Sequence, residues 1–390
     1  MKTRELLISD KNYVVVSHKC MTHPDDDLVA YLNENHAKNV LFITHSFFIS
    51  PDRRSKLVWY KNGNIYKTAK SKDYCNLPEA LLYIKEFFFT FYWIVSSKLR
   101  YDLYVGLDGL VVIFGIFLRL TTVVRKVAFW AIDLVPDNRF AQEWKNLVYR
   151  KVNVFSYAHS DEVWDLSPRM ADARVKFLGI NESKFTNRRL VPYGVWLQKI
   201  RRFAYSECDH SIVFMGTLLP KQGVQEVLKA LPLILKSYPK VMFKIIGGGT
   251  YEDDLTKLAN SLGVADRCVF MGLISSDDYY SVLLPEIAKS AIAIAPYVKE
   301  LDNWTYFADP GKIKTYLACG VPVVLTNLPW NVQEIVDNNC GMLTTGEPED
   351  IANSCIQLMD SKVNQIYRAN ALKYSMTFDY STVFHFLGNS

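Results

Sequence analysis

The sequence predicts an α/β protein with two domains, each built on a doubly wound parallel sheet. The chain has 390 residues, which is too long for one ordinary core. In its second half, short apolar runs alternate with helix-length amphipathic segments, and the first half repeats this alternation less cleanly. Strands that alternate with helices of this length are typical of parallel sheets.

The expected elements follow from these runs. In the first half, the expected strands are "YVVVSH" (13–18), "NVLFITH" (39–45), "DLYVGL" (102–107) and "KVAFWAID" (126–133), with helices near 78–97, 109–120 and 140–157. In the second half, the expected strands are "SIVFMG" (211–216), "VMFKIIG" (241–247), "CVFMG" (268–272), "AIAIAP" (291–296) and "VPVVLT" (321–326). Helices are expected between them at 223–237, 252–262, 277–287 and 311–319, and a helical tail follows.

The domain boundary is expected in a polar segment between the two halves. We predict a first domain at 1–195, a linker at 196–210, a second domain at 211–365 and a helical tail at 366–390 that packs back on the first domain. Two such domains would leave a cleft between the carboxyl ends of their strands, where ligands of α/β proteins bind.

The composition is that of a soluble globular protein, with 49% hydrophobic and 22% charged residues. The first residues lack an uncharged apolar stretch, so we expect no signal peptide. The apolar stretches 81–97 and 109–118 are interrupted by charge or too short to span a bilayer. Seven cysteines without a CxxC pair predict reduced thiols in the cytoplasm.

Charge is unevenly distributed along the chain. Residues 1–195 hold 28 basic and 20 acidic residues, a net charge of +8, and the remainder carries −3. A basic half with aromatic-rich helices is compatible with a membrane surface or an anionic, lipid-linked substrate. The alternative is a solvated basic surface over buried helices.

Several short motifs occur in a characteristic order. They are "VPYGVW", "FMGTLLPKQGVQEVLKAL", "KIIGGGTYEDDLTKLA", "CVFMGLIS", "YLACGVPVV" and "NVQEIVDNNCGMLTT". This ordered set, over about residues 155–360, resembles the GT-B glycosyltransferases, most closely family 4 and its relatives. The resemblance implies two Rossmann-like domains, with a nucleotide sugar bound by the second domain and an acceptor by the first.

The loop "GTLLPKQG" is the first donor-binding candidate. Glycine allows backbone N–H groups to approach a diphosphate closely, which makes Gly216 a candidate. In the family, a basic pair here neutralises the leaving diphosphate; this chain has Thr217 at the arginine position, with Lys221 beside Gln222 at the lysine position. The resemblance also implies Gly247 and Gly248 of "GGG" as donor contacts. The remaining donor-side candidates end two further expected strands: Gly272 and Tyr297.

The segment "DPGKIKTY" departs from the family pattern. Family 4 enzymes usually carry Glu-x7-Glu before "ACGVPVV", and here those positions hold Phe307 and Thr315. The segment instead resembles a branch of GT-B enzymes that includes exopolysaccharide glucuronosyltransferases. That resemblance implies that Lys312 contacts the nucleotide phosphates, that the Thr315 hydroxyl faces the diphosphate or ribose, and that Asp309 accepts hydrogen bonds from sugar hydroxyls.

Lysine in a first helical turn opposes the helix dipole, which favours an anion near Lys312. The alternative is that this lysine is solvated. Glu334 matches the family glutamate that often binds the ribose, although a glutamate is also favourable in a first helical turn.

Acceptor-side candidates follow the expected strands of the first half. Asp133 ends an apolar strand and is the candidate general base or acceptor-hydroxyl ligand, with Asp137 as second choice. Asp133 would equally serve to cap the following turn. The weaker candidates are His18 and His45, which end expected strands, and Ser167 and Arg169, which follow one.

The acidic run "HPDDD" (23–27) offers carboxylates that bind hard cations, but it also fits a helix N-terminus. We therefore expect no metal site and no cofactor; the resemblance likewise implies metal-independent chemistry.

Together these observations predict a glycosyltransferase that moves a sugar from a nucleoside diphosphate sugar, most simply a UDP- or GDP-sugar, to a hydroxyl of a glycan or lipid-linked glycan in surface polysaccharide synthesis. We expect it in the cytoplasm, at the inner face of the membrane. Two alternatives stay open, a GT-B epimerase and a non-catalytic GT-B scaffold; nucleic-acid binding is disfavoured because no basic stripe with interleaved aromatics stands out.

Overall fold

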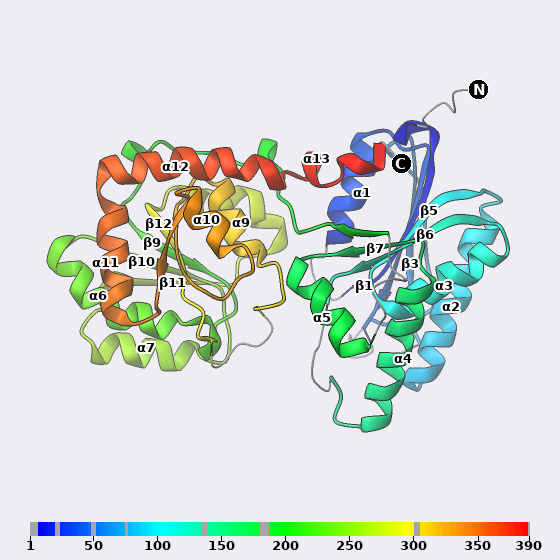
Figure 1. The fold of residues 1–390 in the computed structure, drawn as a ribbon, viewed down its shortest axis with the longest axis horizontal. Coiled ribbons are helices and arrows are strands. Elements are labelled where there is room, and N and C mark those ends of the chain that lie inside the picture. Colours follow the sequence, from blue (N-terminus) through cyan, green and yellow to red (C-terminus); the bar gives the residue numbers. More distant parts are fainter. Residues whose placement is uncertain are drawn as a thin grey trace. The chain divides into compact units, whose positions relative to one another are not determined.

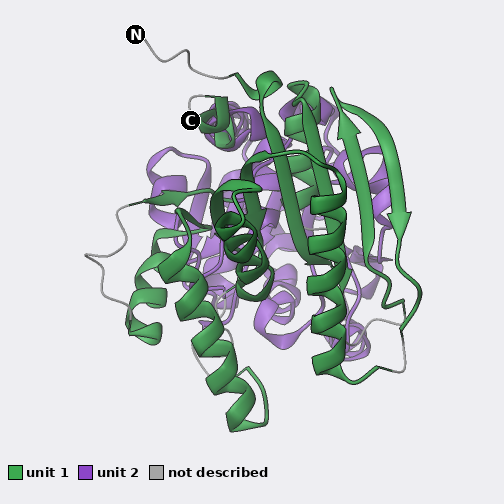
Figure 2. Ribbon diagram, turned by 90° about the vertical axis from the view of Figure 1, so that its right-hand side faces the viewer, with its two compact units in different colours: residues 1–192, 383–390 green, residues 193–382 purple. Residues whose placement is uncertain are grey.

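The computed structural model describes residues 7–19, 24–47, 52–74, 77–133, 139–179, 187–299 and 305–388. The chain forms two compact units (Figures 1 and 2). Unit 1 comprises residues 1–192 and 383–390, and unit 2 comprises residues 193–382. Within each unit, helices cover a sheet, so the predicted α/β class is confirmed.

The sheet of unit 1 has the order β4-β3-β2-β1-β5-β6-β7-β8 in the described part of the chain. Its strands are β1 (Asn12–Lys19), β2 (Asn39–Ser46), β3 (Lys56–Lys61), β4 (Asn64–Lys70), β5 (Tyr101–Gly106), β6 (Val124–Ala131), β7 (Glu162–Asp165) and β8 (Arg188–Leu190). The pairs are parallel except at β2–β3 and β3–β4, which are antiparallel. The hairpin of β3 and β4 was not among the expected strands.

Helices cover both faces of this sheet. They are α1 (Pro24–Glu34), α2 (Glu79–Ser96), α3 (Gly109–Leu120), α4 (Glu143–His159) and α5 (Pro168–Leu178). Helices α2, α3 and α4 lie on one face, while α1 and the C-terminal segment lie on the other (Figure 1). Phe384 of that segment is fully buried between the rings of Tyr31 and Trp130.

The parallel register of β1 and β2 places their last residues side by side. His18 lies opposite His45 at the carboxyl ends of these two strands. Both side chains are buried, because α2 covers this edge of the sheet.

Unit 2 has a sheet in which every pair is parallel, with the order β11-β10-β9-β12-β13-β14. Its strands are β9 (Ile212–Met215), β10 (Phe243–Ile246), β11 (Cys268–Gly272), β12 (Ile292–Ala295), β13 (Val323–Thr326) and β14 (Gly341–Thr344). Each expected strand of the second half is present, and β14 was not among the expected strands.

The helices of unit 2 are α6 (Val224–Ser237), α7 (Glu252–Ser261), α8 (Leu284–Ala288), α9 (Gly311–Ala318), α10 (Val332–Asp337), α11 (Pro348–Met359) and α12 (Ser361–Ser375), and α13 (Tyr380–Val383) spans the boundary with unit 1. Successive residues of β9 and β12 alternate between two apolar cores. One core holds α6, α7 and α11, and the other holds α8, α9, α10 and α12. The sheet is thus buried on both faces, which explains its continuous apolar strands.

The strand order of unit 2 reverses at its centre. From β9 the chain proceeds to β10 and β11 on one side, and then crosses to β12, β13 and β14 on the other. The carboxyl ends of β9 and β12 therefore flank a topological switch point, where ligands of doubly wound sheets bind.

The chain passes between the units twice, and the two passing segments are joined within unit 2. The N–H of Val195 donates to the carbonyl of Phe378 at 3.0 Å, and the N–H of Tyr380 donates to the carbonyl of Val195 at 2.9 Å. The expected linker 196–210 and most of the expected tail 366–390 thus fall inside unit 2, and only residues 383–390 fall in unit 1.

Candidate functional site

The first candidate site lies at the switch point of unit 2 and centres on Lys312 in the first turn of α9. The Lys312 ammonium donates to the side-chain carbonyl of Gln222 at 2.5 Å. It also lies 4.5 Å from the ring centroid of Phe214, at the end of β9, and 4.6 Å from that of Tyr297, just after β12. The two strands that flank the switch point thus meet at one partly buried cation.

Glycine backbones form the floor beside this cation. A Cβ atom on Gly216 would lie 3.2 Å from the Lys312 Nζ. A Cβ atom on Gly247 would lie 2.0 Å from the Gly216 carbonyl oxygen, so the two loops have no room for a side chain. Both glycines have a positive φ, at 153° and 134°.

Backbone hydrogen bonds tie the neighbouring loops together. The N–H of Leu218 donates to the carbonyl of Gly248 at 3.0 Å, and the N–H of Gly247 donates to the carbonyl of Gly272 at 2.9 Å. The carbonyl of Lys221 accepts from the N–H of Val298, in the loop after β12, at 3.0 Å. The expected glycine candidates and the Lys221 backbone are therefore held at the same edge of the sheet.

The other donor candidates differ in their exposure. Thr217 is exposed in the loop after β9. Thr315 is buried, and its hydroxyl bonds to the carbonyl of Gly311 at 3.1 Å and lies 3.4 Å from the hydroxyl of Tyr279. Glu334 is exposed in the first turn of α10, where burial and this carboxylate raise the pKa of Tyr374.

Asp309 is buried, and protein groups are the partners of its carboxylate. It is 1% exposed, and its carboxylate accepts hydrogen bonds from the Tyr193 N–H at 2.7 Å and the Trp330 indole at 2.9 Å. The Lys314 ammonium forms a 2.5 Å ion pair with it and also donates to the Tyr193 carbonyl. Protein groups thus surround this carboxylate, which holds the first residue of unit 2, and the expected contact of Asp309 with sugar hydroxyls stays a prediction.

The second candidate site lies at the carboxyl edge of the unit 1 sheet. His18 contacts two carboxylates, through Nδ1 with Asp108 at 2.7 Å and through Nε2 with Glu86 at 2.9 Å. Asp108 caps α3, since it accepts hydrogen bonds from the N–H groups of Leu110 and Val111. Its side chain is 38% exposed, whereas that of Glu86 is 3% exposed. The cluster thus presents one carboxylate to its surroundings.

These contacts fix the charge of His18. Burial lowers the pKa of His18, but the charges and hydrogen bonds of Asp108 and Glu86 outweigh burial and raise it to about 10. Both ring nitrogens of the imidazolium then donate to carboxylates. The same contact helps to lower the pKa of Asp108, against the effect of burial.

His45 differs from His18 because it contacts hydroxyl groups and not carboxylates. Its ring lies 5.7 Å from that of His18 and bonds to the hydroxyls of Ser55 and Thr90, each at 2.8 Å. Burial and the neighbouring charge of His18 lower the pKa of His45 well below its usual value. One histidine of the pair is therefore charged and the other is neutral.

The remaining acceptor candidates lie near this edge. Asp133 follows β6 and forms a 2.5 Å ion pair with Arg139, with its side chain 41% exposed. Ser167 is buried and caps α5, whose first turn holds the partly buried Arg169. Asp137 lies outside the described residues.

Sequence reasoning missed Glu86 and Asp108, and it did not foresee the contact of the Gln222 side chain with Lys312. Asp108 had a local signal, since an aspartate directly before an apolar helix is a typical N-cap.

The acidic run at residues 25–27 forms the first turn of α1, as expected. Among the described residues, no group of three or more His, Cys, Asp or Glu side chains is placed to hold a metal ion.

Comparison with solved structures defines the fold of the whole chain. Sucrose-phosphate synthase from Thermosynechococcus elongatus matches with a TM-score of 0.69 and 15% identity over 97% of each chain. Anabaena HepE in complex with UDP-glucose matches with a TM-score of 0.65 and 14% identity, over 96% of this chain and 97% of its own. WaaG, a glycosyltransferase involved in lipopolysaccharide biosynthesis, matches with a TM-score of 0.62 and 13% identity over 96% and 97%. The chain has the GT-B fold.

Comparison of sequences identifies the family resemblance within unit 2. Residues 209–361 match the family model described as glycosyl transferases group 1. A GDP-mannose-dependent phosphatidylinositol monomannoside mannosyltransferase of Mycolicibacterium smegmatis is 27% identical over 148 residues, 37% of each chain. The alpha-monoglucosyldiacylglycerol synthase of Streptococcus pneumoniae is 24% identical over 189 residues, 44% of this chain and 40% of its own. The expected resemblance to GT-B glycosyltransferases is confirmed, and it spans about two fifths of the length of these relatives.

The buried pair of Asp309 and Lys314 predicts a large loss of stability on its disruption. Their side chains are 0% and 4% exposed, so Asp309→Ala would leave a buried ammonium without its counter-ion. We expect the free energy of unfolding to fall by about 3–5 kcal/mol, measured by urea denaturation. Asp309→Leu combined with Lys314→Met removes both charges and is expected to recover part of the loss. Wild-type stability for Asp309→Ala would show that the pair does not hold unit 2 together.

The His18 cluster predicts a specific dependence of stability on pH. The folded pKa of about 10 exceeds the ordinary value of 6.5, so the stabilisation by protonated His18 is fully present below pH 6.5 and is lost as the pH rises through 10. We expect the urea midpoint of the wild type to fall more steeply between pH 7 and pH 10 than that of His18→Gln. His159→Gln, at an exposed histidine of the same unit, should keep the wild-type slope. Equal slopes for wild type and His18→Gln would contradict the charged assignment.

Proposed function

We propose that this protein is a metal-independent glycosyltransferase that moves a sugar from a nucleoside diphosphate sugar to a hydroxyl group of a glycan or lipid-linked glycan in surface polysaccharide synthesis. The observation that carries this proposal is the Lys312 ammonium, held beside the Gly216 and Gly247 backbones at the switch point of unit 2. A cation beside closely packed backbone glycines is suited to a diphosphate.

The chemistry follows from this arrangement. The bond between the anomeric carbon and the diphosphate oxygen breaks, and a bond forms between that carbon and the acceptor hydroxyl oxygen. Negative charge grows on the departing nucleoside diphosphate, and the Lys312 ammonium stabilises it, helped by Lys221 and the loop N–H groups. The proton of the acceptor hydroxyl passes to a base.

The donor is proposed to be a UDP- or GDP-sugar. The relatives include an enzyme described as GDP-mannose-dependent, and one similar structure holds UDP-glucose. In this proposal Thr217, Thr315 and Glu334 contribute hydroxyl and carboxylate contacts to the nucleotide, and Tyr297 orients Lys312 through its ring. Asp309 supports the site from the interior.

Asp133 is proposed as the general base or acceptor-hydroxyl ligand for an inverting transfer. Asp133 follows β6, and its carboxylate is partly exposed beside Arg139. A retaining transfer would use a donor phosphate oxygen in this role instead. None of the relatives and similar structures named above is described as an epimerase or a scaffold protein.

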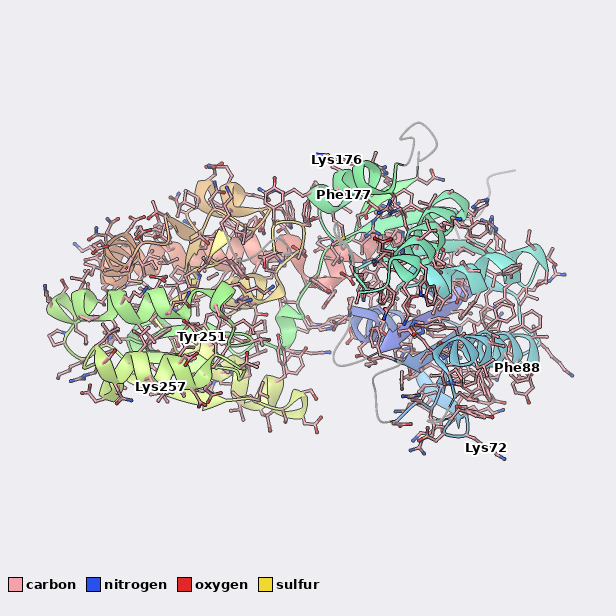
Figure 3. All side chains as sticks on the ribbon, turned by 90° about the horizontal axis from the view of Figure 1, so that it is seen from below. Lys72, Phe88, Lys176, Phe177, Tyr251 and Lys257 are labelled. Atoms are coloured by element: carbon pink, nitrogen blue, oxygen red, sulfur yellow. The ribbon has the colours of Figure 1, made fainter. Side chains whose placement is uncertain are left out.

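We also propose that unit 1 contacts the inner face of the cytoplasmic membrane. The outer side of α2 carries six exposed large apolar side chains: Leu81, Ile84, Phe88, Phe91, Tyr92 and Val95. Phe88 is 59% exposed and lies at the outside of unit 1 (Figure 3). The membrane-surface role rests on this apolar face within a basic half of the chain. No helix among the described residues is long and apolar enough to cross a bilayer.

The donor-binding proposal predicts metal-free nucleotide binding that depends on Lys312. Calorimetric titration with UDP, GDP, TDP and ADP should identify one tight-binding nucleotide. Because a charge-assisted hydrogen bond contributes about 1.5–3 kcal/mol, Lys312→Ala should weaken that binding about ten- to hundred-fold. Lys257→Ala, at an exposed lysine of α7 (Figure 3), should leave it unchanged. Absence of binding for all four nucleotides would overturn the proposal.

The membrane proposal predicts binding of the purified protein to vesicles that contain anionic lipid. Ile84→Ser combined with Phe88→Ser should lower the bound fraction at least about ten-fold, since burial of one large apolar side chain contributes about 1.5–3 kcal/mol. Ile366→Ser on α12 of unit 2 has the same 59% exposure as Phe88 and serves as the control. Vesicle co-sedimentation at low salt measures the effect, and a protein that ignores these vesicles would refute the contact.

A further inference from the structure

Unit 1 contains a hollow of about 420 Å³ at the amino-terminal ends of β5 and β6. Its lining includes Arg100, Asp102, Arg119, Thr122 and Arg125, and we call it the arginine pocket. It lies at the amino-terminal end of β5, whereas Asp108 follows the carboxyl end of that strand. The arginine pocket and the His18 cluster are therefore at opposite ends of the strands.

The fold brings the three arginines together from three local segments. Arg100 directly precedes β5, Arg119 lies in the last turn of α3, and Arg125 is the second residue of β6. The N–H of Tyr101 donates to the carbonyl of Val123 at 2.8 Å, which joins the starts of the two strands. In the turn between α3 and β6, the N–H of Thr122 donates to the carbonyl of Arg119 at 3.0 Å.

Arg119 is held in place by neighbouring groups. Its guanidinium forms a 2.5 Å ion pair with Asp161 and donates to the carbonyl of His159 at 2.9 Å. The exposed Arg100 and Arg125 form no ion pair with any described residue. The pocket therefore combines one oriented guanidinium with two that remain available for an anion.

Charges of both signs surround the pocket, and the three arginines of the lining outnumber its single carboxylate. Asp102 is the one carboxylate of the lining, and it accepts a hydrogen bond from the Asn12 N–H at 2.9 Å. Burial lowers the pKa of Lys11; Asp102 opposes this effect, while Lys126 and Arg125 add to it. Lys126 lies outside the lining and adds one further positive charge, 3.9 Å from the Glu162 carboxylate.

We propose that the arginine pocket binds a phosphate group, as a phosphomonoester or phosphodiester. Guanidinium groups form paired, charge-assisted hydrogen bonds with phosphate oxygens, and the Thr122 hydroxyl provides a further donor in the lining. The volume falls within the range of about 300–1,000 Å³ typical of small-molecule sites, which leaves room for an organic group on the phosphate. This site is independent of the donor site in unit 2.

The proposal is tested with inorganic phosphate and glycerol 3-phosphate, titrated by calorimetry at constant ionic strength. The background is Lys312→Ala, so that the proposed donor site contributes little. Arg100→Gln combined with Arg125→Gln should weaken binding at least five-fold, and each single substitution should have a smaller effect. Lys257→Gln, in unit 2, is the matched control and should bind as the background does. Circular dichroism confirms that the variants are folded.

A second arm distinguishes a soluble phosphate ester from a lipid headgroup. Phosphatidylcholine vesicles with and without phosphatidic acid are sedimented with the same variants. Arginine-dependent binding of both glycerol 3-phosphate and the acidic vesicles identifies a lipid headgroup, and binding of glycerol 3-phosphate alone identifies a soluble ester. Equal binding by the double variant and its background, or no binding of any probe, overturns the proposal. Loss of nucleotide binding in unit 2 would leave this result unaffected.

Discussion

The candidate site of unit 2 depends on one close backbone contact. The loops after β9 and β10 approach until a Cβ atom on Gly247 would lie 2.0 Å from the Gly216 carbonyl oxygen. Only glycine allows this approach, and both residues also have positive φ values. Beside these loops, the Lys312 ammonium lies 4.5 Å from the centroid of the Phe214 ring, and a Cβ atom on Gly216 would lie 3.2 Å from it. A side chain at either glycine would displace the loops and the cation together.

In unit 1, the burial of ionisable side chains and their positions in the sequence both determine where charge lies. His18 lies between Glu86 and Asp108, and two carboxylates around one imidazolium leave a net negative charge on this cluster. His45, one strand away, stays neutral because a second buried cation beside His18 would be unfavourable. Basic residues dominate the sequence of this half, and the arginine pocket collects three of them at the amino-terminal edge. The two ends of the strands therefore differ in charge: a partly exposed carboxylate lies at one end, and arginines gather at the other.

The sequence predicted those parts of the fold that local pattern determines. Apolar runs buried on both sheet faces identified β9 to β13, and the glycine loops followed from their place after strands. The hairpin of β3 and β4 was missed although Asn62 and Gly63 form a typical hairpin turn with φ values of 49° and 82°. The contacts of His18 were beyond local pattern, since its partners are 68 and 90 residues away in the chain. The role of Asp309 likewise depends on burial, which only the folded chain defines.

The segment "DPGKIKTY" shows why neighbouring lysines of the same helix have different roles. Lys312 and Lys314 are two positions apart, which corresponds to about 200° around a helix, so they extend from opposite sides of α9. One side faces the loops after β9 and β12, where Lys312 meets Gln222 and two aromatic rings. The other side faces the start of unit 2, where Lys314 binds Asp309 and the Tyr193 carbonyl. A lysine at the Gln222 position would place a second ammonium beside that of Lys312, and the like charges would repel. The neutral amide of Gln222 instead accepts a hydrogen bond from the Lys312 ammonium.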